Sequence, residues 1–374
     1  MRMMRCLLLL VGSAAVAEPE AMAAPGRLVS AEPMAAGAAD GLPEGARAWR
    51  IRYETRDHDG RPTESTGMVI APNAAGRDRP VLAWQHGTVG VTAPCAVSER
   101  PYRFTQIPDL PGMIARGWVV VATDYPGLGT PGPHAYLNPN VAGHAALDAV
   151  AAAGALAEAG AGRRYALWGH SQGGHASLAA AERARAALPG HELVAVAAAS
   201  PPTDLAANFA AAKVPVRSFL SSFAAKSWEA AYGYPLSTLG NRTTQDLIRK
   251  IGARCEGDPQ SLVTKVDIVR LLNRLKGVNI AAIDPWRARV AASAVGAVPI
   301  GVPLLMSEGD ADNLVAPAVT RDFVARACAR GERLGYIEVP GGDHAGNPAA
   351  LQEEVVAWLA DRFAGGPAPS DCPG

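Results

Sequence analysis

The sequence has 374 residues, 49% hydrophobic and 19% charged, enough for one large α/β domain with an inserted subdomain. This composition argues against a disordered chain. Lysine plus arginine and aspartate plus glutamate number 35 each, so the basic excess typical of nucleic-acid-binding proteins is missing and no nucleic-acid partner is predicted.

The first segment, 1–17, has the pattern of a signal peptide. A basic start precedes the apolar run Cys6–Val11, and Ala15-Val16-Ala17 forms a small-residue cleavage site. The run is too short to span a bilayer. We therefore predict a secreted or periplasmic protein cleaved near Ala17, with an uncleaved anchor as the alternative. Segment 18–47, rich in Ala, Pro and Gly, is predicted to be an extended leader.

Strand-like and helix-like segments then follow along the chain. The first strands are predicted at Trp49–Thr55, Ser65–Ile70, Pro80–Gln85, Trp118–Thr123, Tyr165–Trp168 and Leu193–Ala199, with helices at Asn140–Gly160 and Gln172–Leu188. After Pro202 short helical pieces, such as Asn208–Ala212 and Thr264–Lys276, alternate with aromatic loops. The alternation resumes with strands Val302–Ser307 and Tyr336–Val339 and helices Ala318–Arg330 and Ala349–Phe363.

Strands that alternate with helices predict a mostly parallel sheet with helices on both faces. Residues 48–202 and 299–364 would form its core. Residues 203–298 would form a mainly helical cap inserted at the carboxyl edge of the sheet, where binding crevices form. Residues 365–374 would form a tail.

The motif Gly169-His170-Ser171-Gln172-Gly173 fits G-x-S-x-G and lies between a predicted strand and a predicted helix. In this context the serine occupies a strained turn, so the residues two before and two after it must be almost free of side chain. We predict that Ser171 is a catalytic nucleophile.

A serine nucleophile needs a base and an acid that orients the base, in the chain order Ser, Asp or Glu, His. His344 follows the strand Tyr336–Val339 and is the predicted base. Two aspartates compete in the loop after Val302–Ser307. Asp312 precedes a turn into the next helix and is preferred; Asp310, nearer the strand end, is the alternative.

The oxyanion of a tetrahedral intermediate needs two backbone amides. We predict one from Gln172, directly after the nucleophile, and one from Thr88 in the loop His86-Gly87-Thr88; Val89 is the alternative for the second. His86 is predicted to be structural. This mechanism requires no metal and no organic cofactor, and none is predicted.

Several motifs together resemble the secretory lipase family of the α/β-hydrolase superfamily. They are His86-Gly87-Thr88, Asp124-Tyr125-Pro126-Gly127-Leu128-Gly129, Gly169-His170-Ser171-Gln172-Gly173-Gly174, Asp312-Asn313-Leu314-Val315 and Asp343-His344. The resemblance covers roughly 49–363. It implies an α/β-hydrolase fold and hydrolysis of lipid or other carboxylic esters, with an inserted cap over the site. His-Gly-Thr departs from the fungal members, so the second oxyanion amide stays open.

The predicted function is a lipase or esterase that forms an acyl-enzyme, with a small-molecule or lipid ester as substrate, including substrates at a lipid–water interface. The predicted cap carries many aromatic residues, and Phe219 and Phe223 are predicted to contact the acyl chain. Two alternatives remain at this point: an exported serine peptidase or amidase on the same fold, and a binding module without catalysis. Neither the natural ester nor the oligomeric state is predicted.

Removal of Cys6 with the signal peptide leaves four cysteines, an even number that predicts two disulfides in an exported chain. Cys328 ends a helix and Cys372 lies in the tail after the final helix, so Cys328–Cys372 is sterically reasonable. The remaining pair, Cys95–Cys255, would tie the cap to the oxyanion loop.

Overall fold

The computed structural model describes residues 26–35, 40–259 and 262–373. The predicted signal peptide lies outside these ranges. Within them, no helix is both long enough and apolar enough to cross a membrane.

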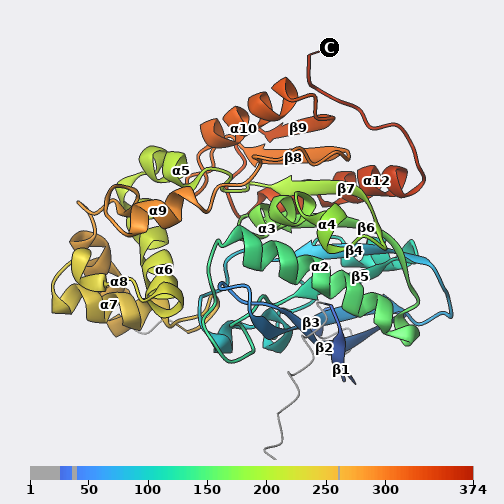
Figure 1. The fold of residues 1–374 in the computed structure, drawn as a ribbon, viewed down its shortest axis with the longest axis horizontal. Helices are drawn as coiled ribbons and strands as arrows, with labels where there is room; N and C mark the ends of the chain where they lie inside the picture. Colours follow the sequence, from blue (N-terminus) through green and yellow to red (C-terminus); the bar gives the residue numbers. More distant parts are fainter. Residues whose placement is uncertain (1–25, 36–39, 260–261, 374) are drawn as a thin grey trace, which may run out of the picture.

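The described residues form a nine-stranded sheet in the order β1-β2-β3-β5-β4-β6-β7-β8-β9 (Figure 1). The first four strands in this order pair antiparallel, and the pairs from β5 across to β9 are parallel. The strands are β1 Leu28–Pro33, β2 Ala46–Arg56, β3 Pro62–Pro72, β4 Arg79–Gln85, β5 Val119–Thr123, β6 Ala161–His170, β7 Glu192–Ala199, β8 Leu304–Gly309 and β9 Leu334–Val339. The parallel strands therefore all end at the same edge.

Helices cover both faces of this sheet. One face packs on α2 (Pro139–Ala155), α3 (Gln172–Ala181), α4 (Ala184–Ala187) and α10 (Pro317–Ala329). The other face packs on α1 (Leu110–Ala115) and α12 (Gln352–Phe363), and α11 (Asn347–Ala350) precedes α12. Because both faces are covered, the central strands are buried along their length, as their continuous apolar runs predicted. The predicted α/β-hydrolase fold is confirmed.

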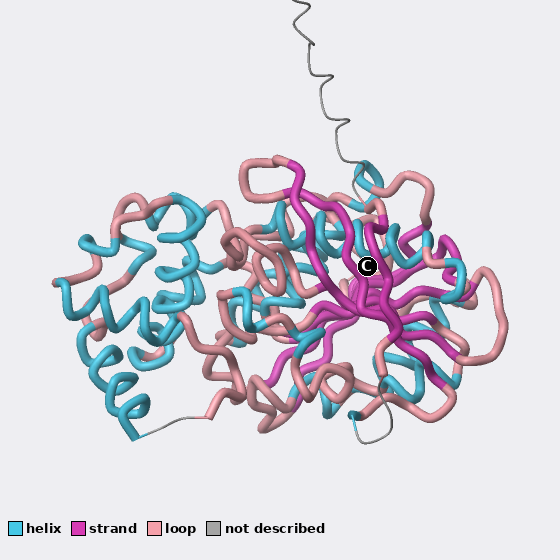
Figure 2. Tube along the Cα trace, turned by 90° about the horizontal axis from the view of Figure 1, so that it is seen from below, coloured by secondary structure: helices cyan, strands magenta, loops and turns pink. Residues whose placement is uncertain are grey.

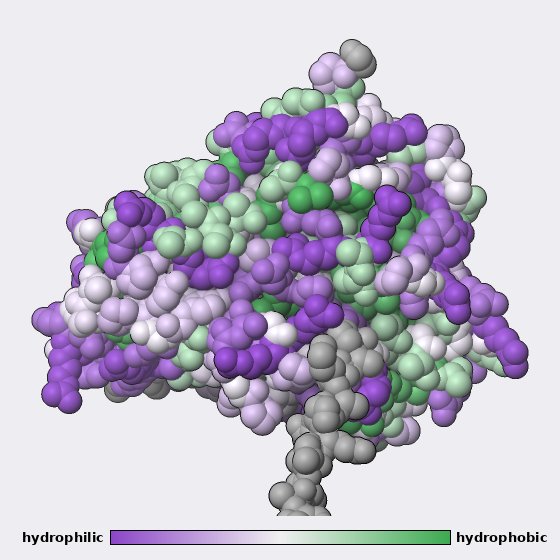
Figure 3. Space-filling view, in the orientation of Figure 1, coloured by the Kyte–Doolittle hydropathy of each residue, from purple (hydrophilic) through white to green (hydrophobic). Residues whose placement is uncertain are grey.

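Between β7 and β8 the chain leaves the sheet and forms a separate helical unit (Figure 2). Its helices are α5 Leu205–Ala211, α6 Val214–Tyr232, α7 Arg242–Gly252, α8 Leu262–Arg274 and α9 Trp286–Ala291. This unit has its own core, in which Phe209, Trp228 and Trp286 are fully buried. Its outer surface mixes hydrophilic and apolar residues, like the rest of the face in Figure 3.

The structure differs from the sequence prediction at three places. Part of the predicted leader forms β1, which pairs antiparallel with β2 at the sheet edge. The helix predicted over Gln172–Leu188 is split into α3 and α4. The helix predicted over Ala349–Phe363 begins as α12 at Gln352, after the short α11.

Candidate active site

Ser171 lies in a sharp turn between β6 and α3. Its backbone has φ 54° and ψ −120°, a conformation that is strained for a residue with a side chain. A Cβ atom on Gly169 would overlap the backbone carbonyl of Gly173, and one on Gly173 would overlap that of Gln85. Both glycines are therefore required for the turn. It presents the serine at the carboxyl edge of the sheet, with the amide end of α3 behind it.

The loop after β4 passes directly beside the serine. A Cβ atom on Gly87 would lie 3.8 Å from the Ser171 Cβ, which shows how closely the two backbones approach. The next residue, Thr88, has its hydroxyl 2.8 Å from the Tyr136 hydroxyl. In the part of the chain that the structure describes, the amides of Thr88 and Gln172 donate no hydrogen bond. Both are thus available to an oxyanion.

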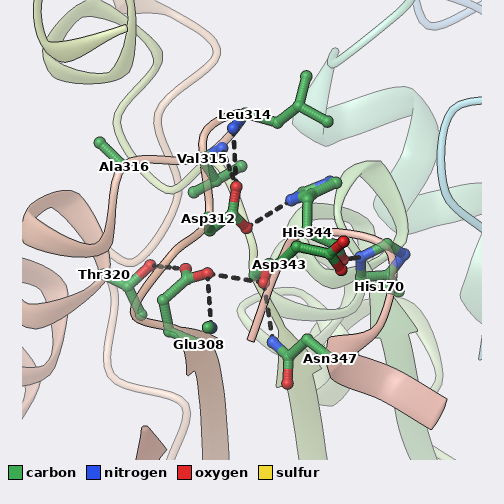
Figure 4. A network of polar contacts seen from close by, with 12 residues as sticks. His170, Glu308, Asp312, Leu314, Val315, Ala316, Thr320, Asp343, His344 and Asn347 are labelled. Atoms are coloured by element: carbon green, nitrogen blue, oxygen red, sulfur yellow. Dashed lines mark hydrogen bonds and ion pairs between the residues drawn. The ribbon is translucent and has the colours of Figure 1, made fainter. Parts of the chain in front are cut away.

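His344 and Asp312 form a hydrogen-bonded pair (Figure 4). The Nδ1–H of His344 donates to Asp312 Oδ2 at 2.6 Å, and the Asp312 carboxylate is fully buried. The other oxygen, Oδ1, accepts from the amides of Leu314 at 2.7 Å and Val315 at 2.9 Å. Burial by itself would raise the pKa of Asp312, but the bond to His344 and its charge hold that pKa below the usual value.

The second aspartate of this loop, Asp310, has a different contact. Its Oδ1 accepts from the Gly341 amide at 2.6 Å, so it links the loop after β8 to the loop that carries His344. Of the two predicted candidates, the structure places Asp312 against the imidazole and Asp310 away from it.

His170, inside the serine motif, packs on His344. The two ring centroids are 4.8 Å apart, and His170 Nε2 donates to the carbonyl of His344 at 2.8 Å. Burial lowers the pKa of His170 to about 4, so this ring is neutral at physiological pH. This contact brings the loop of His344 next to the turn of Ser171. No sequence pattern indicated this contact, because His170 and His344 are far apart along the chain.

His134, a second histidine that no sequence motif marked, contacts the Gln172 side chain. Its Nδ1–H donates to the Pro126 carbonyl at 3.1 Å, which leaves Nε2 to accept from Gln172 Nε2 at 3.0 Å. Burial lowers the pKa of His134 to about 4. The amide nitrogen of the Gln172 side chain is therefore held by His134. His86 is also buried, with Nδ1 2.7 Å from the Gly87 carbonyl.

The helical unit contacts the loop that carries Asp312 through Asn208 of α5. Asn208 Nδ2 donates to the Leu314 carbonyl at 3.0 Å, and its Oδ1 accepts from the Ala316 amide at 2.9 Å. Of the two residues predicted to meet an acyl chain, Phe219 is 37% exposed and Phe223 is half-buried, and their rings are 5.0 Å apart. Both lie on α6.

The four cysteines are paired as predicted. Cys95 is bonded to Cys255, so the loop after β4 is tied to the helical unit, and Cys328 is bonded to Cys372. The segment around Cys255 also contacts the oxyanion loop directly, because the Glu256 amide donates to the Val89 carbonyl at 2.8 Å. No group of three or more His, Cys, Asp or Glu side chains among the described residues is arranged to hold a metal ion.

Comparison with solved structures defines the class of protein. The structure matches Candida antarctica lipase A in its closed state with a TM-score of 0.76 at 18% identity, over 93% of this chain and 85% of the lipase. It matches the rice cell wall degrading esterase LipA from Xanthomonas oryzae with a TM-score of 0.67 at 19% identity, over 91% of this chain and 96% of that esterase. The chain has the α/β-hydrolase fold of these enzymes.

The sequence itself gives a narrower assignment. Residues 106–259, which include Ser171, match the secretory lipase family model. The resemblance predicted from the motifs is thus confirmed for this segment of the chain. A comparison with curated proteins found no significant match.

Proposed function

We propose that the protein is a serine carboxylic-ester hydrolase in which Ser171 is the nucleophile, His344 the general base and Asp312 the acid that orients it. The observation that carries this proposal is the 2.6 Å hydrogen bond between His344 and Asp312, next to a strained serine turn. The relationship to secretory lipases supports an ester as substrate.

In the first step, Ser171 Oγ attacks the ester carbonyl carbon while His344 Nε2 takes the hydroxyl proton. The carbonyl oxygen becomes an oxyanion between the amides of Gln172 and Thr88, each worth about 3 kcal/mol of barrier by analogy with measured oxyanion donors. When the intermediate collapses, the C–O bond to the alcohol breaks and His344 gives the proton to the leaving alkoxide. Water then hydrolyses the acyl-enzyme by the same route.

Asp312 is well placed to orient His344 because both oxygens of its carboxylate accept hydrogen bonds. The amides of Leu314 and Val315 hold one carboxylate oxygen, so the other can only face the imidazole. A hydrogen bond at Nδ1 leaves Nε2 as the basic nitrogen, which is the tautomer that proton abstraction from Ser171 needs.

Residues 203–298 act in this proposal as a cap over the site, with Phe219 and Phe223 as contacts for the acyl chain. The contact between these two rings on α6 and the link from Asn208 to the loop that carries Asp312 support this role. The two disulfides support export, because such bonds persist in oxidising compartments. The signal-peptide pattern of 1–17 agrees with export.

The test compares Ser171→Ala with Ser177→Ala, because Ser177 lies nearby on α3. The Ser177 hydroxyl is buried and makes no hydrogen bond within the described residues, so its removal should leave turnover of a short p-nitrophenyl ester near wild type. Ser171→Ala should lose at least about a thousandfold in kcat and should no longer react with a fluorophosphonate. Retained turnover together with labelling of another serine would refute the assignment.

A further inference from the structure

The structure contains a buried carboxyl group next to the proposed triad that the mechanism above does not use. Glu308 is the next-to-last residue of β8 and is 0% exposed. Among the described residues, no lysine, arginine or histidine forms an ion pair with it. A buried carboxylate without a cation is costly, so the protein must either stabilise this charge in another way or keep the group protonated.

The contacts of Glu308 suit a neutral acid. Its Oε1 accepts from the Ser200 hydroxyl at 2.7 Å and faces the Gly309 amide at 3.2 Å, and its Oε2 accepts from the Thr320 hydroxyl at 2.6 Å (Figure 4). Hydroxyl groups can donate or accept, so they adapt to either protonation state. They do not supply the compensation that a cation would give.

The same contacts connect the two loops of the proposed triad. Ser200, directly after β7, also accepts from Asn347 Nδ2 at 2.8 Å. Asn347 lies three residues after His344 in the chain and is itself fully buried. Glu308 thus joins the strand end that leads to Asp312, the end of β7, α10 and the segment that follows His344.

Asp312 competes with Glu308 for a single negative charge. Two adjacent buried carboxyl groups do not both ionise readily. Asp312 accepts three N–H hydrogen bonds, one of them from His344, whereas Glu308 receives two hydroxyls and one longer amide contact. The charge therefore belongs on Asp312 and the proton on Glu308.

We propose that Glu308 is held as a neutral carboxylic acid and acts as a positioning residue for the Asp312–His344 pair. This inference rests on the proposed function for its kinetic consequence, but the protonation state of Glu308 does not depend on it.

The electrostatics agree with this arrangement. Burial, followed by the neighbouring Asp312, raises the pKa of Glu308 to about 8. The other polar groups around Glu308 add no cation. Tyr336 on β9 is neutral, and Glu338, which is the register partner of Glu308 on β9, is already paired with Arg321 of α10. Above about pH 8 a second buried negative charge would form beside Asp312 and disturb its hold on His344.

The first experiment detects the proton directly, by infrared spectroscopy of the intact protein. At pH 7 the wild type should show a carbonyl band of a protonated carboxyl group that disappears around pH 8 and is missing in Glu308→Gln. Asp148→Asn is the matched control, because burial raises the pKa of Asp148 to about 6 at a different place, on α2. That variant should lose only a band that titrates near pH 6. Absence of the upper titration in the wild type would overturn the proposal.

The second experiment compares pH profiles of kcat for a short p-nitrophenyl ester, read at the isosbestic wavelength of nitrophenol. Wild-type kcat should fall about fivefold as the pH rises through about 8, and this fall should be missing in Glu308→Gln, which is neutral at every pH. Glu308→Leu, which cannot bond Ser200, should lower kcat with little change in KM. If Glu308→Gln lowered kcat as much as Glu308→Leu at all pH values, an ionised Glu308 would be required instead.

The two experiments separate this inference from the proposed function. If the folded wild type hydrolysed no ester, the proposed function would fail, and the infrared titration would still decide whether Glu308 is neutral. If ester hydrolysis were normal and the band were absent, only the inference would fail.

Discussion

The disulfide between Cys95 and Cys255 should matter for catalysis, whereas the one between Cys328 and Cys372 should matter for stability alone. Their sequence separations are 160 and 44 residues. In the loop-entropy estimate these closures stabilise the fold by about 5 and about 4 kcal/mol at 25 °C. The similar values make the second bond a matched control for the first.

The difference lies in what each bond holds. Next to Cys255, the Glu256 amide donates to Val89, and the guanidinium of Arg100 pairs with Asp258 at 2.8 Å. Opening the Cys95–Cys255 bond therefore loosens the chain one residue from Thr88, the proposed oxyanion donor. Cys328 and Cys372 lie at the end of α10 and in the C-terminal tail, and neither segment contributes a residue to the site.

The assay measures the melting temperature and kcat of Cys95→Ser/Cys255→Ser and of Cys328→Ser/Cys372→Ser. For a chain of this length the expected decreases in melting temperature are about 7 °C and about 5 °C. At a temperature where both variants stay folded, kcat should fall about tenfold in the first variant only, the equivalent of about 1.4 kcal/mol of misplaced oxyanion stabilisation. An equal loss of kcat in both variants, or no loss in the first, would refute the link between this disulfide and the oxyanion loop.

Three further outcomes are expected. Asp312→Asn should lower kcat on the order of 10³–10⁴-fold because the amide favours the wrong imidazole tautomer. Asp310→Asn, which alters only a bond to Gly341, should lower kcat less than about tenfold. The reverse ranking in steady-state kinetics would contradict the proposed roles. Phe219→Trp or Phe223→Trp should shift the preference among p-nitrophenyl esters toward shorter acyl chains without loss of activity on the shortest, and an unchanged profile for both would place them in the core of the helical unit. For Glu308, the folded-state pKa of about 8 lies above the unfolded value, so its contribution to stability is complete below about pH 4.5 and is lost as the pH rises to about 8. Denaturant titrations should show that the wild type loses roughly 3–5 kcal/mol of unfolding free energy relative to Glu308→Gln over that interval. Parallel pH curves for the two proteins would contradict this expectation.

The sheet was predictable because its central strands are buried on both faces. Such strands read as unbroken apolar runs, and Val119–Thr123 and Leu304–Gly309 were located to within a few residues. The edge strand β1 was missed because its residues are only half-buried or exposed, so no apolar pattern marks it. Its pairing with β2 is visible only when the partner strand is in place.

At Glu182, where the predicted helix is split, the side chain contacts a segment that lies far away in the chain. The Glu182 carboxylate accepts from the Gly296 amide at 2.6 Å and from the Val298 amide at 3.3 Å, both in the segment that leads back to β8. Periodicity within Gln172–Leu188 carries no information about such a partner. Local patterns therefore predicted the helical residues but not the break.

The choice between Asp312 and Asp310 shows how far sequence alone reaches at the site. The turn into α10 let Asp312 be preferred, because it allows the side chain to stay inside the crevice. In the structure this carboxylate also accepts from the amides of Leu314 and Val315, which the sequence did not indicate. His170, His134 and Glu308 were not selected because each acts through a partner from a distant segment. Of these, Glu308 did carry a signal: it is a charged residue at the end of an otherwise apolar buried strand.

The position of Glu308 also explains how the loop that carries Asp312 is supported by the core. Asp312 holds His344 with one oxygen, and the helical unit contacts the same loop through Asn208, whose side chain bonds Leu314 and Ala316. The contacts of Glu308 with Ser200 and Thr320 anchor the residues before this loop to the end of β7 and to α10. If the helical unit moves for substrate entry, as its proposed role as a cap requires, these anchors would leave the Asp312–His344 geometry unchanged, provided that Glu308 stays neutral.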